Sequence, residues 1–475
     1  MTPLGPVEVA VSVHVVGAPR AFHVPYEGEN AAVKQAFPDG FLPSYGSGLA
    51  FKGKDGQGAL EFYCLTDRGP NGDGPGVPLR NGEGHSDSKL FPAPGFTPSI
   101  GVMRLADGAA QLVARLPIRT ATGALASGLP IPHGALGSSA EVPLFDKLRF
   151  DPDGKALFDA DGIDSEAIAF DPRRKSLWVT DEYGPFLLRI DAHSGIILER
   201  YAPGAGLPAV LALRRANRGM EGMTLDPASG RIHAFLQSPL SDGTAYYDVT
   251  AKEEKIERFA RFLRWVEFDP DTAATLRMLA YPLDGGPYAD GRTGNIKLGD
   301  MVALGGEKFV VIEQGEGAHG AMINNLMLVE IANATDILQH QWNPATSDLE
   351  RSSMAGAPVN GADWSRVTPL KKTLLLNLNT LGWVAEKAEG LAIVDACTLA
   401  MSNDNDFGLK TRVFDAQGAE REDADVTEFK VDAGGKIVEG ADPTDTVRIG
   451  RGKQAERPLT LWLLSFGQPL ASYGT

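Results

Sequence analysis

Carboxylate and carboxamide side chains recur at two fixed points of a repeated pattern in this sequence. The first point, at the start of one apolar run, is occupied by Ser47, Glu166, Glu221, Asp300 and Glu389. The second point, at the end of the next apolar run, is occupied by Asp67, Asp181, Gln237, Glu313 and Asn403. Carboxylates brought together repel one another unless a cation neutralises them or their pKa values rise. Oxygen ligands without His or Cys suit Ca²⁺ or Mg²⁺, so the pattern predicts a calcium site, with magnesium as the alternative.

Particular residues are predicted to hold the metal, to catalyse and to bind substrate. The predicted metal ligands are Glu166, Asp181, Glu221, Glu389, Asn403 and Asp404. Glu221 or Glu182 is a candidate general base, because a carboxylate that holds no metal is able to accept a proton. We expect Arg218 and Arg68 to bind an anionic part of the substrate through paired hydrogen bonds. Arg218 is counted among the catalytic candidates. Its alternative role is a salt bridge to Glu221. The other substrate-binding candidates are Tyr183, Asn217 and His319.

Two acidic loops add further oxygen ligands. One is DRGPNGDGPG (residues 67–76), and the other is FDADGIDSE (residues 158–166). Neither has the ligand spacing of an EF-hand, so each is either a part of the metal site or a solvated turn.

The elements that must position these residues are short strands. Five segments share an apolar strand, a turn and a second apolar strand: they begin at Ser47, Ser165, Met220, Gly299 and Ala388. The turns contain hairpin residues such as Asp171-Pro172 and Gly305-Gly306. Further apolar runs follow each hairpin, and four strands per repeat are typical of propeller blades. In a propeller, residues at the same point of each innermost strand form a ring around the central channel.

We therefore predict an all-β fold: one β-propeller domain over residues 1–475, with long insertions between strands. Five blade repeats are visible, and the insertions leave room for a sixth. The apolar runs at residues 8–16 and 459–466 have no repeat of their own. Pairing them would close the ring between the two ends of the chain.

Composition narrows the function classes. The formal charge is −16, from 45 basic and 61 acidic residues, which argues against nucleic acid and anionic membranes as partners. The sequence contains no run of 18 apolar residues, so insertion into a membrane is not predicted. The sequence has neither a G-x-S-x-G elbow nor an H-E-x-x-H motif, so a serine hydrolase and a zinc enzyme are not indicated.

The phrases SEAIAF…LWVTDEYGP, NRGMEGM, EKAEGLAIV and SNDNDFG, in this order, resemble the signature stretches of the phytase-like family, described as having esterase-like activity of phytase. The resemblance runs, with gaps, from about Ser47 to Gly408. Two departures, LQSPL in the third repeat and EQGEG in the fourth, argue against a metal site that uses every repeat. The resemblance implies a periplasmic or secreted protein. The start of the chain has no signal-peptide pattern, so a cytoplasmic location stays open.

The resemblance favours a calcium-dependent hydrolase of phosphate or carboxylic esters, with a small-molecule ester as its substrate. Two alternatives are open at this point. One is a gluconolactonase-like hydrolase of sugar lactones, since such propellers also hold a divalent ion through Glu, Asn and Asp. The other is a propeller that binds a ligand without catalysis and uses calcium only for its structure.

Overall fold

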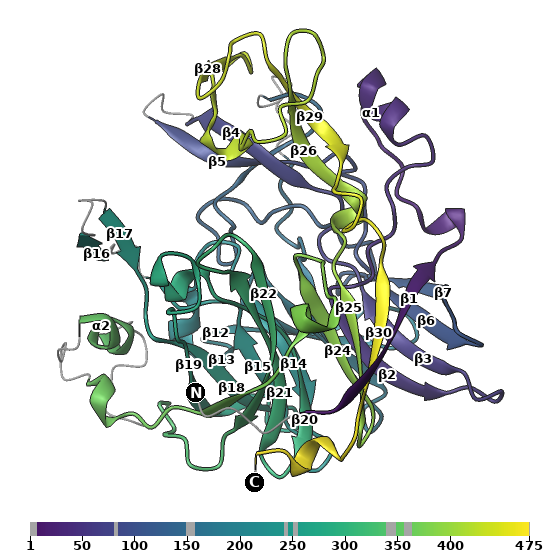
Figure 1. The fold of residues 1–475 in the computed structure, drawn as a ribbon, viewed down its shortest axis with the longest axis vertical. Helices are drawn as coiled ribbons and strands as arrows, with labels where there is room; N and C mark the ends of the chain where they lie inside the picture. The colour runs from purple at the N-terminus through teal and green to yellow at the C-terminus, as the bar shows by residue number, and fades with distance from the viewer. Residues whose placement is uncertain are drawn as a thin grey trace.

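The computed structural model describes residues 7–79, 84–148, 157–241, 246–249, 255–338, 348–355 and 363–474. Strands dominate these residues (Figure 1), and the α-helices among them are α1 (Ala31–Ala36) and α2 (Asp348–Ala355). Short 3-10 helices lie in the connections: Arg20–Phe22, Ala209–Leu213, Ala289–Gly291, Thr293–Asn295, Trp364–Arg366, Leu378–Leu381, Asp406–Gly408, Val426–Glu428 and Leu470–Ser472. The all-β prediction is confirmed.

Each repeated segment forms the first two strands of an antiparallel four-stranded arrangement, and we number these sheets one to five along the chain. From the first strand outward, the first sheet contains β2 (Gly48–Lys54), β3 (Leu60–Leu65), β6 (Ser99–Ala106) and β7 (Ala109–Pro117), and the second contains β9 (Ser165–Asp171), β10 (Ser176–Asp181), β11 (Phe186–Asp191) and β12 (Ile197–Pro203). The third contains β14 (Met220–Leu225), β15 (Ile232–Leu236), β18 (Phe262–Asp269) and β19 (Ala274–Pro282), and the fourth contains β20 (Lys297–Gly305), β21 (Lys308–Glu316), β22 (Met322–Glu330) and β23 (Lys371–Asn377). The fifth contains β24 (Ala388–Asp395), β25 (Thr398–Asn403), β30 (Thr460–Phe466) and β1 (Val9–Gly17). A short strand, β13 (Gly206–Leu207), extends the second sheet.

The first strands of these sheets pack against one another in the order β2, β9, β14, β20, β24 and back to β2. A separate hydrophobic cluster lies between each pair of neighbouring sheets, including the pair formed by the fifth and the first. Both faces of every sheet are therefore covered by another sheet. This accounts for the nearly continuous apolar character of the inner strands, and the arrangement is propeller-like.

The two ends of the chain meet in the fifth sheet. β1 pairs antiparallel with β30 from Val9 opposite Phe466 to Val15 opposite Thr460, which confirms the predicted pairing of residues 8–16 with 459–466. β1 also pairs with β7 of the first sheet at Val16 and Ala110. The N-terminal strand thus joins the last sheet to the first, next to β30 in Figure 1.

Asp300 occupies the position of the carboxylate ring in the fourth sheet, but its oxygens are taken up by backbone amides. Its Oδ1 accepts hydrogen bonds from the amides of Met301 (2.8 Å) and Met223 (3.2 Å), and its Oδ2 accepts one from Leu391 (3.2 Å). Burial raises the pKa of this carboxyl group, whereas the amide hydrogen bonds lower it. Asp300 therefore ties the inner strands of the third, fourth and fifth sheets together and is not available to a metal ion.

The long insertions build a separate layer, which we call the cap. One sheet of the cap contains β28 (Ile437–Glu439), β27 (Lys430–Val431), β4 (Gly72–Pro78), β5 (His85–Leu90) and β8 (Val142–Leu144), and the other pairs β26 (Leu409–Phe414) with β29 (Thr446–Arg451). The cap has its own small hydrophobic clusters and stands apart from the main body in Figure 1. A further hairpin consists of β16 (Tyr246–Val249) and β17 (Lys255–Arg258). Within the described residues, no helix combines the length and the apolar character needed to cross a membrane.

The buried His233 in β15 should make the stability of the protein depend on pH. Burial lowers its pKa from 6.5 to about 4, and its Nδ1 accepts a hydrogen bond from Trp265 Nε1 (3.2 Å). The unfolded chain takes up a proton below pH 6.5 that the folded protein does not, so His233 should cost about 3 kcal/mol of stability between pH 6.5 and 4. Urea unfolding of wild type and His233→Gln across this range should show that the substitution removes this part of the pH dependence. Equal slopes for the two proteins would contradict the prediction.

Candidate functional site

A polar cavity of about 530 Å³ lies between the sheet ends and the cap. A second cavity, of about 720 Å³, is lined mostly by apolar residues from the opposite parts of the same inner strands, such as Leu49, Ile168 and Val302. The predicted site residues that line the polar cavity are Arg68, Glu166, Glu182, Asn217, Arg218, Glu389 and Asp404. The chemistry that the sequence indicates therefore belongs to the polar end.

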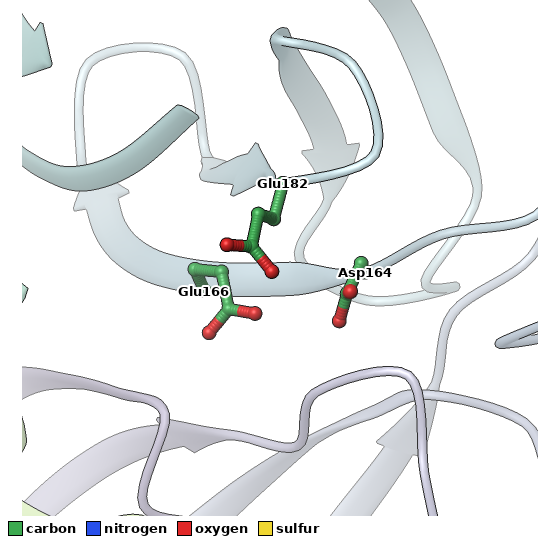
Figure 2. A group of neighbouring side chains, drawn as sticks. All are labelled: Asp164, Glu166 and Glu182. Atoms are coloured by element: carbon green, nitrogen blue, oxygen red, sulfur yellow. The ribbon is translucent and has the colours of Figure 1, made fainter. Parts of the chain in front are cut away.

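The second sheet brings three carboxylates together in this cavity. Asp164, Glu166 and Glu182 each offer one oxygen, and these oxygens all lie within 4.8 Å of one another. Figure 2 shows Asp164 and Glu166 at the start of β9, with Glu182 beside them just after β10. The strand pairing explains this proximity: Ser165 pairs with Asp181, and the Glu182 amide donates to the Asp164 carbonyl (2.7 Å). We call these three residues the acidic triad.

The electrostatics of the acidic triad fit a divalent cation. The pKa of Glu182 is raised to about 7, first by burial and then by the charge of Asp164. The pKa of Glu166 is also raised, by burial and by the neighbouring charges of Glu221 and Asp164. Asp164 Oδ2 is buried without a hydrogen-bond partner, and Arg68 Nε lies 3.5 Å from it. Oxygen ligands that are buried, mutually repelling and incompletely paired suit Ca²⁺ or Mg²⁺.

The predicted ring contains Glu166, Glu221 and Glu389, whose charges raise one another's pKa values. Each of Glu221 and Glu389 raises the pKa of Glu166, and Glu389 raises that of Glu221. Burial raises the pKa of Glu389 to about 8. Glu221 is not part of the cavity lining. Its Oε2 accepts a hydrogen bond from Gln237 Nε2 (3.1 Å), and Gln237 Oε1 in turn accepts one from Arg218. Glu221 thus orients Arg218 through Gln237, and the salt bridge considered for these two residues is not formed.

Arg68 lines the cavity and is held in place by protein groups. Its Nη1 donates to Glu141 Oε2 (3.2 Å) and Asn217 Oδ1 (3.0 Å). Its guanidinium lies over the ring of Tyr183, 5.7 Å from the centroid, and the Tyr183 hydroxyl donates to the Gly128 carbonyl (2.8 Å). Arg68 and Asn217 therefore form part of the cavity wall, and the buried Tyr183 packs against Arg68 outside the lining. Substrate binding by Arg68 and Tyr183 stays a prediction; Arg68 lines the cavity, whereas Tyr183 does not.

Asp404 is neutralised by a lysine that the sequence analysis did not select. Lys387 Nζ lies 2.7 Å from Asp404 Oδ2 and 2.6 Å from Asp406 Oδ1, while Ser44 Oγ donates to Asp404 Oδ1 (2.7 Å). The lysine and these hydrogen bonds lower the pKa of Asp404 in spite of its burial. A carboxylate that is already paired has no need of a metal ion, so the structure argues against Asp404 as a ligand.

Three other predicted residues lie outside the cavity lining. Asp181 Oδ1 accepts hydrogen bonds from the amides of Asp164 (3.1 Å) and Tyr183 (3.0 Å), so it holds the turn that carries the acidic triad. Asn403 Oδ1 accepts from the Thr460 amide (2.8 Å) and fastens β25 to β30. His319 is exposed in the turn after β21. The Oδ2 of Asp181 is buried without a hydrogen-bond partner. The ligand role of Asp181 and Asn403 and the substrate role of His319 stay predictions.

Sequence reasoning missed several residues of the cavity. Asp164 lies in one of the two acidic loops but was not singled out among the oxygens of that loop. Glu141 and Lys387 carry no repeat signal, because they lie in an insertion and between strands. Lys297 did carry one: it precedes Asp300 by three residues, as Arg218 precedes Glu221.

Comparisons with solved structures give weak similarities. An α-L-arabinofuranosidase from Podospora anserina is 8% identical over 96% of this chain and 97% of that chain, with a TM-score of 0.33. A putative 6-phosphogluconolactonase from Bacteroides uniformis is 14% identical over 62% of this chain and 70% of that chain, with a TM-score of 0.26. Such TM-scores are too low to indicate a shared fold. No curated protein matches the chain.

A family model gives the decisive match. The model described as "Phytase-like: Esterase-like activity of phytase" matches residues 47–407, which begin just before β2 and end in the 3-10 helix after β25. The matched range contains the acidic triad and the first two strands of each of the five numbered sheets. The chain belongs to the phytase-like family.

Proposed function

We propose that the protein is a divalent-metal-dependent hydrolase of phosphate or carboxylic esters, acting at the central channel of a five-bladed propeller. The observation that carries the proposal is the acidic triad, whose three buried oxygens converge within 4.8 Å at the wall of a polar cavity. Calcium is the preferred ion and magnesium the alternative, because the ligands are all hard oxygens. Membership of the phytase-like family supports ester hydrolysis.

The residues around the acidic triad supply the remaining functions of a hydrolase. A divalent ion at the triad would polarise a phosphoryl or carbonyl oxygen and lower the pKa of a bound water. Glu389 lines the same cavity outside the triad, and its pKa of about 8 keeps it mostly protonated at neutral pH, so it is able to donate a proton as a general acid. Arg218 is held toward the cavity by Gln237 and meets the anionic part of the substrate.

Metal removal tests this function. Hydrolysis of p-nitrophenyl phosphate or of a p-nitrophenyl acyl ester should disappear after treatment with EDTA and return when Ca²⁺ or Mg²⁺ is added in excess. A metal at a hundredfold excess over its Kd adds about 2.7 kcal/mol to the free energy of unfolding, so the melting midpoint should rise as well. An unchanged rate and midpoint with EDTA would refute the proposal. Turnover of a lactone alone would replace the ester by a lactone as the substrate.

A further inference from the structure

Two cations occupy matching places in the third and fourth sheets. Arg218 stands three residues before Glu221, and Lys297 stands three residues before Asp300, in the same position of the repeat. Arg218 lies just before β14, and Lys297 is the first residue of β20. Both side chains line the polar cavity. The neighbouring inner strands β14 and β20 therefore place two positive charges at the same polar cavity.

Neither cation has a carboxylate partner. Among the described residues, no carboxylate oxygen lies within 4.0 Å of the Arg218 guanidinium or the Lys297 ammonium. The Arg218 partner is the neutral amide oxygen of Gln237. The other cations beside the acidic triad differ: Lys387 is paired with Asp404 and Asp406, and Arg68 is paired with Glu141 and with Asp164 of the triad. Arg218 and Lys297 thus form a basic wall near the acidic triad.

The charge of Arg218 acts on Lys297. The pKa of Lys297 is lowered to about 8, and the charge of Arg218 is the largest cause, ahead of burial. Glu182 and Glu386 raise this pKa, but from beyond ion-pair distance. Like charges held together away from bulk water are unfavourable unless an ion of opposite charge lies between them. In a chain with a net charge of −16, solubility does not require such a pair, whereas an anionic ligand would relieve its repulsion.

We propose that Arg218 and Lys297 form an oxyanion-binding subsite that takes a phosphate or carboxylate group of the ligand. The fork of the guanidinium suits two oxygens of such a group, and the ammonium adds a compact charge. As part of a substrate site, the subsite rests on the proposed function and restricts the substrates to esters that carry an anionic group. As an anion site it stands without hydrolysis.

Binding of inorganic phosphate to the metal-free protein, measured by isothermal titration calorimetry at constant ionic strength, tests the subsite. Wild type should bind phosphate, and Lys297→Met should weaken binding at least tenfold. Lys297→Arg keeps the charge and should retain affinity within a few-fold. The matched control is Lys54→Met, which removes an exposed lysine from the last position of β2, and it should bind as wild type does.

Acetate is titrated beside phosphate to identify the group. If wild type binds phosphate more tightly than acetate, the subsite is assigned to phosphate; if it binds the two equally, the subsite is assigned to carboxylate. Either result supports the proposal if the anion binds wild type more tightly than chloride does and Lys297→Met abolishes this difference. Phosphate binding that is absent in wild type, or unchanged in Lys297→Met, would overturn it. If Lys297→Met melts below the assay temperature, Lys297→Gln takes its place under the same criteria. Because no turnover is measured, a failed hydrolase assay leaves this result intact.

Discussion

Replacing Asp300 by leucine should lower the free energy of unfolding by at least about 3 kcal/mol, since each buried donor left without an acceptor costs about 1–3 kcal/mol. Three backbone amides, those of Met223, Met301 and Leu391, lose their acceptor in this variant. They belong to three inner strands, so the damage reaches three sheets at once. A loss of this size is a large fraction of the 5–15 kcal/mol typical of folded proteins. Urea unfolding followed by circular dichroism measures it.

Two further variants separate the hydrogen bonds from the shape of the side chain. Asp300→Asn keeps one oxygen for Met223 and Met301 but turns an NH₂ group toward Leu391, so its loss should be smaller than that of Asp300→Leu. Asp423→Leu, in the exposed turn before the 3-10 helix Val426–Glu428, is the matched control and should change stability by less than about 0.5 kcal/mol. If Asp300→Leu unfolds within 1 kcal/mol of wild type, Asp300 does not hold the strands together.

Asp164→Asn should lower kcat/KM for ester hydrolysis by about 10²-fold or more at limiting metal, because it removes one charged ligand from the site that would activate water. The shape of the side chain is kept, and its Oδ1 still accepts the Arg68 amide hydrogen bond (3.1 Å). The loss should therefore come from metal affinity, and excess Ca²⁺ or Mg²⁺ should restore part of the rate. A metal titration of wild type and variant measures both effects.

Two other carboxylates provide the controls for Asp164→Asn. Asp107→Asn makes the same chemical change in an exposed turn and should behave as wild type. Glu221→Gln should cost little, because its amide oxygen is able to accept the hydrogen bond from Gln237. If Asp164→Asn has the kcat/KM of wild type at every metal concentration, the acidic triad is not the metal site. If Glu221→Gln loses much of its kcat/KM, Glu221 is a catalytic residue.

The repeat made much of the architecture predictable. Alternating apolar strands separated by Asp-Pro and Gly-Gly turns correspond to the first two strands of each numbered sheet, and the unpartnered runs at the chain ends pair as expected. Local hydrogen bonding and the need to cover both faces of a sheet determine these features. Both requirements are visible in the order of polar and apolar residues along the chain.

The repeat also determined which carboxylates approach one another. Glu166, Glu221 and Glu389 share a position in their strands, and the inner strands surround one axis, so equivalent positions meet. By the same reasoning Lys297 is the counterpart of Arg218, since each stands three residues before the acidic position of its repeat. Position in a repeat therefore predicts proximity well.

The sequence alone determined the strands, the closure of the chain and the ring of acidic positions, whereas only the tertiary structure decided which acidic residue is available to a ligand. Asp300, Asp404 and Asp164 are all acidic residues near the starts or ends of inner strands, yet they have different partners. Asp300 binds backbone amides, Asp404 binds Lys387, and Asp164 keeps one oxygen without a hydrogen bond, 3.5 Å from Arg68 Nε. These partners come from other sheets or from loops outside the repeat. The charge that remains on a buried carboxylate depends on groups that only folding brings within hydrogen-bonding distance, and the spacing of residues along one chain does not encode them.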